Sequence, residues 1–172
     1  MSRADISRTV LAQPLTAEAF APFGSVIDRS IVAPRPMNAS MAQRFHDLAD
    51  IEVIGDGARV AVGLVEAQPY PLPLRLNLVE RHPLGAQAFV PLNAAPFLVV
   101  VCPDDGGKPG RPRAFVTSPW QGVCYARGTW HGVLTPFGAE QNFVVIDRAG
   151  PGINLEEHVF EQPWFVELPS AS

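Results

Sequence analysis

The chain has 172 residues, of which 47% are apolar and 17% charged, the size and composition of one globular domain expected to cover residues 1–172. Its net charge of −4 argues against nucleic acid or a membrane surface as a partner, because both require a basic patch. No apolar run is long enough to span a membrane, and we expect no signal peptide. Cys102 and Cys124 lie in apolar stretches, which indicates buried free thiols and a cytoplasmic location.

Eighteen prolines favour short strands over long helices. Residues 1–13 are expected to form an arm. Thr16 then predicts the N-cap of a helix of about two turns, which Pro22 and Gly24 end. Short strands are predicted over residues 25–27, 41–49, 60–65, 76–82, 87–91, 97–102, 114–117, 123–125, 133–134 and 142–146, and in two pieces of residues 156–168 around Pro163.

This pattern of many short strands, tight turns and one or two short helices predicts an all-β sandwich or barrel. The strand over residues 97–102 is continuously apolar, as expected of a strand buried on both faces. Residues 103–112 are rich in glycine and proline and are expected to form a surface loop. That loop carries the only lysine, Lys108, which argues against catalysis through a lysine Schiff base, because such a lysine must be desolvated.

The stretch over residues 76–91 carries polar side chains within an apolar pattern. Read with a period of two, one face runs from Leu76 through Glu80 to His82, and the opposite face carries Val79 and Arg81. An apolar face that ends in Glu-x-His is typical of a strand that enters a buried site. The sequence therefore predicts a functional site at the end of this strand.

Two further pieces are predicted to reach the same place. Gln87 begins the strand that returns after the break at residues 83–85, and His131 ends the fragment Gly128-Thr129-Trp130-His131. A histidine at a strand end is often only a hydrogen-bonded structural residue. Glu80, His82 and His131 together favour function, because three polar groups on an apolar face cost stability unless they are used.

Within the β-barrel class, this spacing resembles the cupin superfamily. A cupin's first motif runs His-x-His and then, after three or four residues, Glu, and its second motif ends in Gly-x-x-His. Here Glu80 takes the place of the first histidine and Gln87 that of the glutamate, whereas His82 and His131 keep theirs. The resemblance implies a cupin-like double-stranded β-helix barrel. Glu80, His82, Gln87 and His131 would be the ligands of a divalent metal such as nickel or zinc, but the residues leave metal binding open.

A closer resemblance covers most of the chain. Six segments, in this order, look like the ureidoglycolate lyase family: Pro14-Leu15-Thr16 through Phe23-Gly24, Arg44-Phe45-His46-Asp47-Leu48, Glu80-Arg81-His82-Pro83-Leu84-Gly85, Gln87-Ala88-Phe89-Val90-Pro91, Gly128-Thr129-Trp130-His131 and Ile146-Asp147-Arg148. The resemblance implies a carbon–nitrogen lyase of allantoin and purine degradation that splits ureidoglycolate into glyoxylate and urea. It also implies a homodimer and, in some members, a nickel requirement.

The implied reaction assigns roles to particular residues. Breaking the carbon–nitrogen bond requires a base for the hydroxyl proton, an acid for the departing nitrogen and a cation for the carboxylate. His82, His131 and Glu80 are the predicted catalytic residues. The predicted substrate-binding residues are Gln87 for the ureido group, Arg148 or Arg44 for the carboxylate, and His46 and Trp130 in the pocket.

Two alternatives belong to other classes. One is another metal-dependent cupin enzyme, an isomerase or a dioxygenase. A dioxygenase must hold a redox metal firmly, and Gln87 at a ligand position argues against that. The other is a non-catalytic ligand-binding cupin of the sensor type, for which we would expect an added DNA-binding helical domain. Fold alone does not choose among them, because cupins host unrelated functions.

Overall fold

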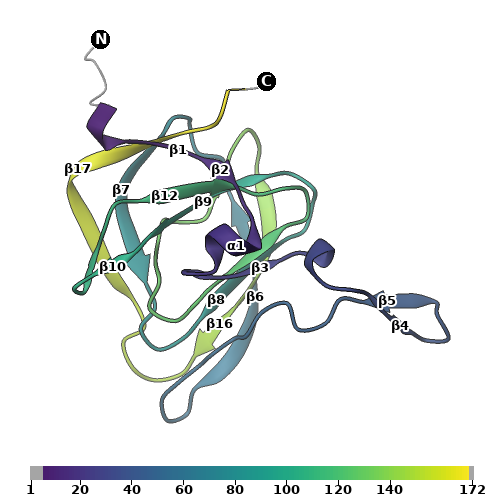
Figure 1. Cartoon of the computed structure of the whole chain (residues 1–172). Helices are drawn as coiled ribbons and strands as arrows, with labels where there is room; N and C mark the ends of the chain where they lie inside the picture. Colours follow the sequence, from purple (N-terminus) through teal and green to yellow (C-terminus); the bar gives the residue numbers. More distant parts are fainter. Residues whose placement is uncertain (1–5, 171–172) are drawn as a thin grey trace.

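The computed structural model describes residues 6–170 of the chain (Figure 1), so part of the predicted N-terminal arm lies outside the described residues. Within residues 6–170, helix is confined to α1 (Ala17–Phe20) and the 3₁₀ turns η1 (Ile6–Arg8) and η2 (Arg29–Ile31). Thr16 caps α1 as predicted, accepting a hydrogen bond from the backbone nitrogen of Ala19 at 3.2 Å, but the helix is shorter than expected. No helix among the described residues has the length and apolar composition needed to cross a bilayer.

The larger of the two main sheets has eight strands and nearly closes on itself. Its strands are, in spatial order, β1 (Thr9–Leu11), β17 (Glu156–Glu167), β7 (Leu74–Arg81), β14 (Trp130–His131), β9 (Phe97–Cys102), β12 (Arg113–Val116) and β2 (Gln13–Pro14), with β15 (Thr135–Pro136) also on β9. The consecutive strands β1 and β2 pair in parallel with β17 and β12, so one short segment joins the two ends of the sheet. Figure 1 shows the resulting barrel-like wall. The all-β, cupin-like fold is therefore confirmed.

The second main sheet has five strands and lies against the first. Its spatial order is β3 (Gly24–Ile27), β13 (Gly122–Tyr125), β8 (Gln87–Pro91), β16 (Gln141–Ala149) and β6 (Arg59–Ala67). Two hairpins lie outside the main sheets: β10 (Asp104–Asp105) with β11 (Lys108–Pro109), and β4 (Arg35–Met37) with β5 (Ala42–Arg44). The β4–β5 hairpin extends away from the barrel as an arm (Figure 1).

Strand β9 forms the wall between two apolar cores. All six of its side chains are buried, as the continuous apolar run predicts. Phe97, Val99 and Val101 pack into the phenylalanine-rich core between the two sheets. The alternate residues pack with Leu76 and Trp130 into a second core on the other side of β9. Burial of both faces fixes the position of β9 and of β14, which pairs with it.

Strand β7 does not keep the predicted period of two. Leu76 and Val79 belong to the same core, although an uninterrupted strand would place them on opposite faces. The pairing with β17 shifts register between Val159 and Trp164, opposite this part of β7. This irregularity reverses the alternation, so Glu80 and Leu76 lie on opposite faces.

Other differences concern element boundaries. The strand considered over residues 41–49 ends at Arg44, and Asp47 has a φ of 62°, which an extended strand does not allow. The strand predicted at residues 133–134 is displaced to β14 and β15 on either side. The loop over residues 103–112 contains the β10–β11 hairpin, and the tail forms one strand, β17, instead of two pieces.

Candidate active site

Glu80, His82 and His131 come together between the sheets, at the end of β7 and on β14. His131 lies directly opposite Glu80 in the β7–β14 pair. The His82 and His131 ring centroids are 5.3 Å apart, and His82 Nε2 lies 4.0 Å from a Glu80 carboxylate oxygen. One ligand atom from each of the three residues lies within 4.8 Å of the others. The predicted convergence of two distant segments is therefore present in the structure.

The hydrogen bonds of the two imidazoles fix where each ring carries its proton. Nδ1 of His82 lies 2.7 Å from the backbone oxygen of Asn154, and Nδ1 of His131 lies 3.0 Å from that of Gly132. A carbonyl oxygen only accepts, so Nδ1 is the protonated nitrogen in each neutral ring. Both Nε2 atoms then present a lone pair, and both are buried without a hydrogen-bond partner among the described residues. Such atoms require a donor or a cation.

Burial shapes the titration of this cluster. It lowers the pKa of His131 to about 3, so this imidazole is neutral at physiological pH. It also raises the pKa of the Glu80 carboxyl; nearby Glu157 adds to the rise and His82 opposes it. Tyr125 stacks on His131 with ring centroids 4.2 Å apart and planes 4° from parallel, which holds the imidazole in place. The site thus contains one histidine that resists protonation and one paired with a carboxylate.

A row of side chains on the five-stranded sheet faces this cluster. Tyr125 pairs with Gln87 across β13 and β8, and Asp147 directly follows Ile146, which pairs with Ala88 at the end of the β8–β16 ladder. Gln87 donates a 3.5 Å hydrogen bond to Asp147, and its Oε1 is buried without a partner among the described residues. Because Tyr125 stacks on His131, this row and the Glu80–His131 pair line the same interior region. The structure therefore brings Gln87 to the predicted site.

Arg148 is not directed to this site. It follows Asp147 on β16 and faces the opposite way, with its Nε donating to the backbone oxygen of Ile54 at 2.8 Å. Its other nitrogens donate to the backbone oxygens of Gly150 at 3.4 Å and Pro151 at 2.6 Å. A Cβ added at Gly85 would lie 2.6 Å from the Arg148 Cβ, so the side chain is tightly packed. These contacts commit the Arg148 guanidinium to backbone oxygens, so the structure does not bring this side chain to the cluster of Glu80, His82 and His131.

Arg44 and His46 are likewise away from the cluster. Arg44 ends strand β5 on the projecting arm, His46 follows it in irregular chain, and both side chains are exposed. The two residues do not share the strand predicted over residues 41–49, because β5 ends at Arg44. Neither residue has a described contact with Glu80, His82 or His131.

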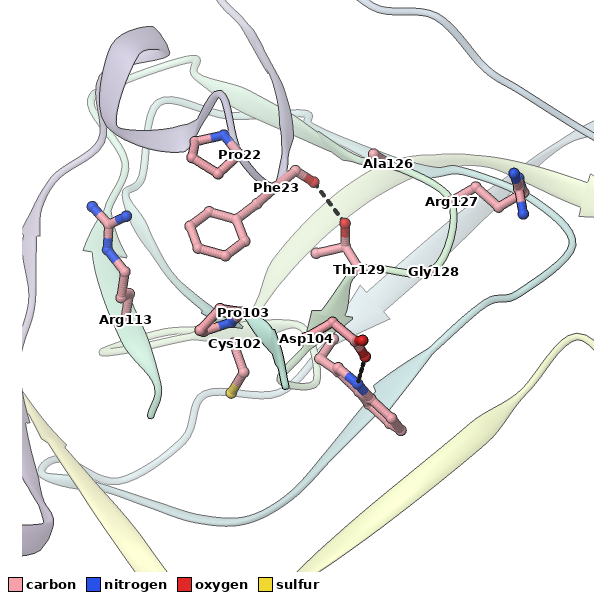
Figure 2. Close-up of a pocket in the computed structure, with 11 residues that line it drawn as sticks. Pro22, Phe23, Cys102, Pro103, Asp104, Arg113, Ala126, Arg127, Gly128 and Thr129 are labelled. Atoms are coloured by element: carbon pink, nitrogen blue, oxygen red, sulfur yellow. Dashed lines mark hydrogen bonds between the residues drawn. The ribbon is translucent and has the colours of Figure 1, made fainter. Parts of the chain in front are cut away.

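Trp130 faces away from its neighbour His131, because successive residues of β14 point to opposite sides. Its indole packs in the second core, stacks against the Arg81 guanidinium 4.4 Å away and donates to Asp104 at 3.0 Å. Trp130 also lines a separate cavity of about 480 Å³. Phe23 and Asp104 line the same cavity (Figure 2). It is therefore not a wall of the histidine site.

The donor set fits a divalent metal. Two neutral imidazole nitrogens and one carboxylate are ligands that nickel and zinc accept, and the oxygen of Gln87 is a weaker, neutral donor. The hydrogen bonds from Nδ1 to backbone oxygens are the outer contacts that metal-binding histidines commonly make. Without a metal, the same atoms accept hydrogen bonds and exchange protons.

Sequence reasoning missed three residues of this site. Tyr125 falls within a predicted strand without an expected role, and Asp147 appears only as the middle residue of the segment Ile146-Asp147-Arg148. Asn154 holds His82 through its backbone oxygen and accepts from the Leu84 nitrogen at 2.8 Å through its side chain. The alternation of β16 could have shown that Asp147 and Arg148 point in opposite directions. No local signal marks Asn154, which lies in a loop far along the chain.

A barrel-like all-β fold with a Glu–His–His cluster, of which His131 is buried and Glu80 and His82 are half-buried, defines a cupin-like protein with a candidate acid–base or metal site. The chain belongs to the ureidoglycolate lyase family, whose model, described as ureidoglycolate lyase, matches residues 7–167. It is 59% identical over 162 residues to a ureidoglycolate lyase of Chelativorans sp. (strain BNC1), covering 94% of this chain and 98% of that protein. It is also 53% identical over 160 residues to a ureidoglycolate lyase of Mesorhizobium japonicum, covering 93% and 98% of the two chains.

Proposed function

We propose that the protein cleaves ureidoglycolate into glyoxylate and urea, as a lyase of allantoin and purine degradation. Family membership supports the substrate, and the buried unpartnered Nε2 atoms of His82 and His131 beside Glu80 carry the proposal structurally. In this reaction the hydroxyl O–H and the C–N bond break, a carbonyl forms, and a proton is delivered to the urea nitrogen. The site must therefore remove one proton and return one proton.

His82 is the proposed base. Its Nε2 lone pair takes the hydroxyl proton, and the Glu80 carboxylate 4.0 Å away stabilises the imidazolium that forms. The proton then passes to the departing nitrogen, so the His82–Glu80 pair serves as both base and acid. His131, held neutral by burial, accepts a hydrogen bond from the substrate without taking its proton.

The same three residues could also hold a divalent metal ion. If a divalent ion such as nickel or zinc is present, we propose Glu80, His82 and His131 as its ligands, with Gln87 as a fourth, and the His82 lone pair would then hold the ion instead of acting as the base. A bound ion would lower the pKa of the substrate hydroxyl and offset the charge of its carboxylate. The chain's own contribution is the fixed direction of both Nε2 lone pairs.

A glyoxylate-release assay with and without chelator tests both proposals. We expect the purified protein to release glyoxylate and urea in equal amounts from ureidoglycolate. A metal requirement predicts loss of activity after chelation and recovery on adding nickel or zinc, with metal content measured in parallel. Unchanged activity after complete metal removal would support the lyase activity and contradict the metal requirement. Absence of glyoxylate from metal-loaded protein would contradict the proposed function.

We also propose that the protein acts as a homodimer. Strand β6 ends the five-stranded sheet, so one of its edges has no neighbouring strand among the described residues. Its outward side chains Val60, Val62 and Leu64 are 44%, 72% and 75% exposed, and Val144 and Ile146 continue this apolar face on β16. A long apolar edge strand invites pairing with another chain, and the same surface on two copies can pair about a two-fold axis.

Replacing Leu64 by glutamate should break this dimer. A charge at the centre of the apolar face must be desolvated in an interface, whereas in a monomer it remains in water. We expect size-exclusion chromatography with light scattering to change from dimer to monomer, with little change in the strand signal by circular dichroism. Val159→Glu, at a residue 70% exposed on the other main sheet, is the matched control and should stay dimeric. An unchanged dimer for Leu64→Glu would place the interface elsewhere.

The remaining proposals concern the whole chain. We retain Arg44 as the proposed carboxylate ligand, acting from the projecting arm on the site of a second subunit, because Arg148 is committed to backbone oxygens.

The match over residues 7–167 supports one catalytic domain spanning residues 1–172. Cys102 and Cys124 are free and buried, which supports a reducing, cytoplasmic location.

A further inference from the structure

Asp147 has no part in the mechanism above, although its side chain enters the same interior region as the proposed catalytic residues. It lies one residue beyond the last pair of the β8–β16 ladder, Ile146 with Ala88, and directly opposite Ala61 of β6. The described residues give its side chain one hydrogen bond, from Nε2 of Gln87 to Oδ2 at 3.5 Å. Gln87 is therefore the residue through which Asp147 contacts the site.

The chemistry of this contact decides which end of the Gln87 amide faces the site. The oxygen and nitrogen of a carboxamide have nearly the same shape, so packing alone does not orient the group. A carboxylate can only accept hydrogen bonds, so the NH₂ end of Gln87 turns toward Asp147. The oxygen then occupies the remaining position, where it is buried without a partner among the described residues. This buried acceptor requires a donor from a ligand.

We infer that Asp147 is a positioning residue that directs the Gln87 oxygen toward the substrate, so that the site selects a ureido group through its N–H donors. This inference rests on the proposed function and adds the basis of substrate selection. A ureido group carries a terminal NH₂ that can donate to the Gln87 oxygen. An acetyl group in its place carries a methyl, which leaves that oxygen unpaired.

Two substrates and two positions test the inference. N-acetyl-2-hydroxyglycine has the same carbinolamide and carboxylate as ureidoglycolate, and cleavage of its C–N bond gives glyoxylate and acetamide. We expect the wild-type protein to prefer ureidoglycolate by about 10- to 100-fold in kcat/KM, the usual range for leaving a buried polar group unpaired. In Asp147→Asn, the asparagine can donate as well as accept, so Gln87 is free to turn over. The preference should therefore fall toward unity.

A double-mutant cycle separates positioning from a structural role. Gln87→Met removes the acceptor at nearly constant length and should also abolish the preference. If Asp147 acts through Gln87, adding Asp147→Asn to Gln87→Met should produce no further change in kcat/KM or in preference. Asp147→Glu keeps an acceptor-only group and should restore part of the preference that Asp147→Asn loses. That variant also serves if Asp147→Asn does not fold.

The outcomes are distinguishable. Glyoxylate from neither substrate in the wild-type protein would contradict the proposed function, whereas activity without preference would contradict only this inference. Full preference in folded Asp147→Asn, or an equal penalty in the Gln87→Met background, would show that Asp147 does not act through Gln87. A lower metal content in Gln87→Met and Asp147→Asn, with preference restored by added metal, would assign the Gln87 oxygen to a metal instead of the substrate.

Discussion

Replacing His82 by alanine should lower kcat/KM for ureidoglycolate by about 10²- to 10⁴-fold, the range typical for loss of a general base. Nε2 of His82 lies 4.0 Å from a Glu80 carboxylate oxygen and has no hydrogen-bond partner among the described residues. Removing the imidazole therefore removes the proposed proton carrier. His131→Ala should be similarly inactive, because the second buried acceptor is lost. Initial rates of glyoxylate release, measured over a range of substrate concentrations, check both variants.

The control for these variants is His158→Gln. His158 packs between the rings of Trp130 and Phe160, on the other side of the large sheet, and has no proposed role in the reaction. It should keep wild-type kcat/KM, while circular dichroism shows that all three variants are folded. Wild-type turnover in folded His82→Ala would end the assignment of the base, and wild-type turnover in His131→Ala would end that of the second acceptor.

Replacing Arg148 by methionine should destabilise the fold and leave the chemistry unchanged. Arg148 is 8% exposed and donates to three backbone oxygens, which methionine cannot do. Leaving these acceptors unpaired should cost roughly 3 kcal/mol of unfolding free energy. For a chain of this length, that loss corresponds to a melting temperature lower by about 6–12 °C. Calorimetry and denaturant unfolding measure the effect.

Kinetics distinguish this structural role from the carboxylate clamp expected from sequence. A structural Arg148 predicts an unchanged KM for ureidoglycolate, measured well below the melting temperature. A clamp predicts a large rise in KM with little loss of stability. Arg59→Met is the control: it replaces an exposed arginine on β6 and should change neither quantity. A rise in KM for Arg148→Met but not for Arg59→Met would support a role for Arg148 in binding the substrate carboxylate.

The convergence of Glu80, His82 and His131 could be predicted because it depends on short-range patterns. A Glu-x-His pair at a strand end and a Gly-x-x-His fragment each place polar atoms beside apolar strands. The same reasoning predicted β9 within its bounds, because a continuous run of apolar residues leaves little ambiguity. These elements agree with the fold at the level of local sequence.

The errors arise where long-range pairing overrides the local pattern. The period of two predicts Leu76 on the face of Glu80, but the shifted register of β17, about half the chain away, reverses the alternation within β7. The sequence around Arg148 suggests a free cation, because no neighbouring residue indicates that it donates to the backbone oxygens of Ile54, Gly150 and Pro151. Tertiary hydrogen bonds of this kind leave no trace in the spacing of residues.

The closure of the large sheet has a consequence for how the protein is made. Thr9 of β1 pairs with Phe165 of β17, and Arg8 reaches the backbone oxygen of Pro163, 155 positions later in the chain. During synthesis, β1 can therefore pair with β17 only after residues 156–167 have left the ribosome. Loops this long close slowly and leave strand edges open in the meantime. We therefore expect β1 to join the sheet late in folding, after β17 has formed.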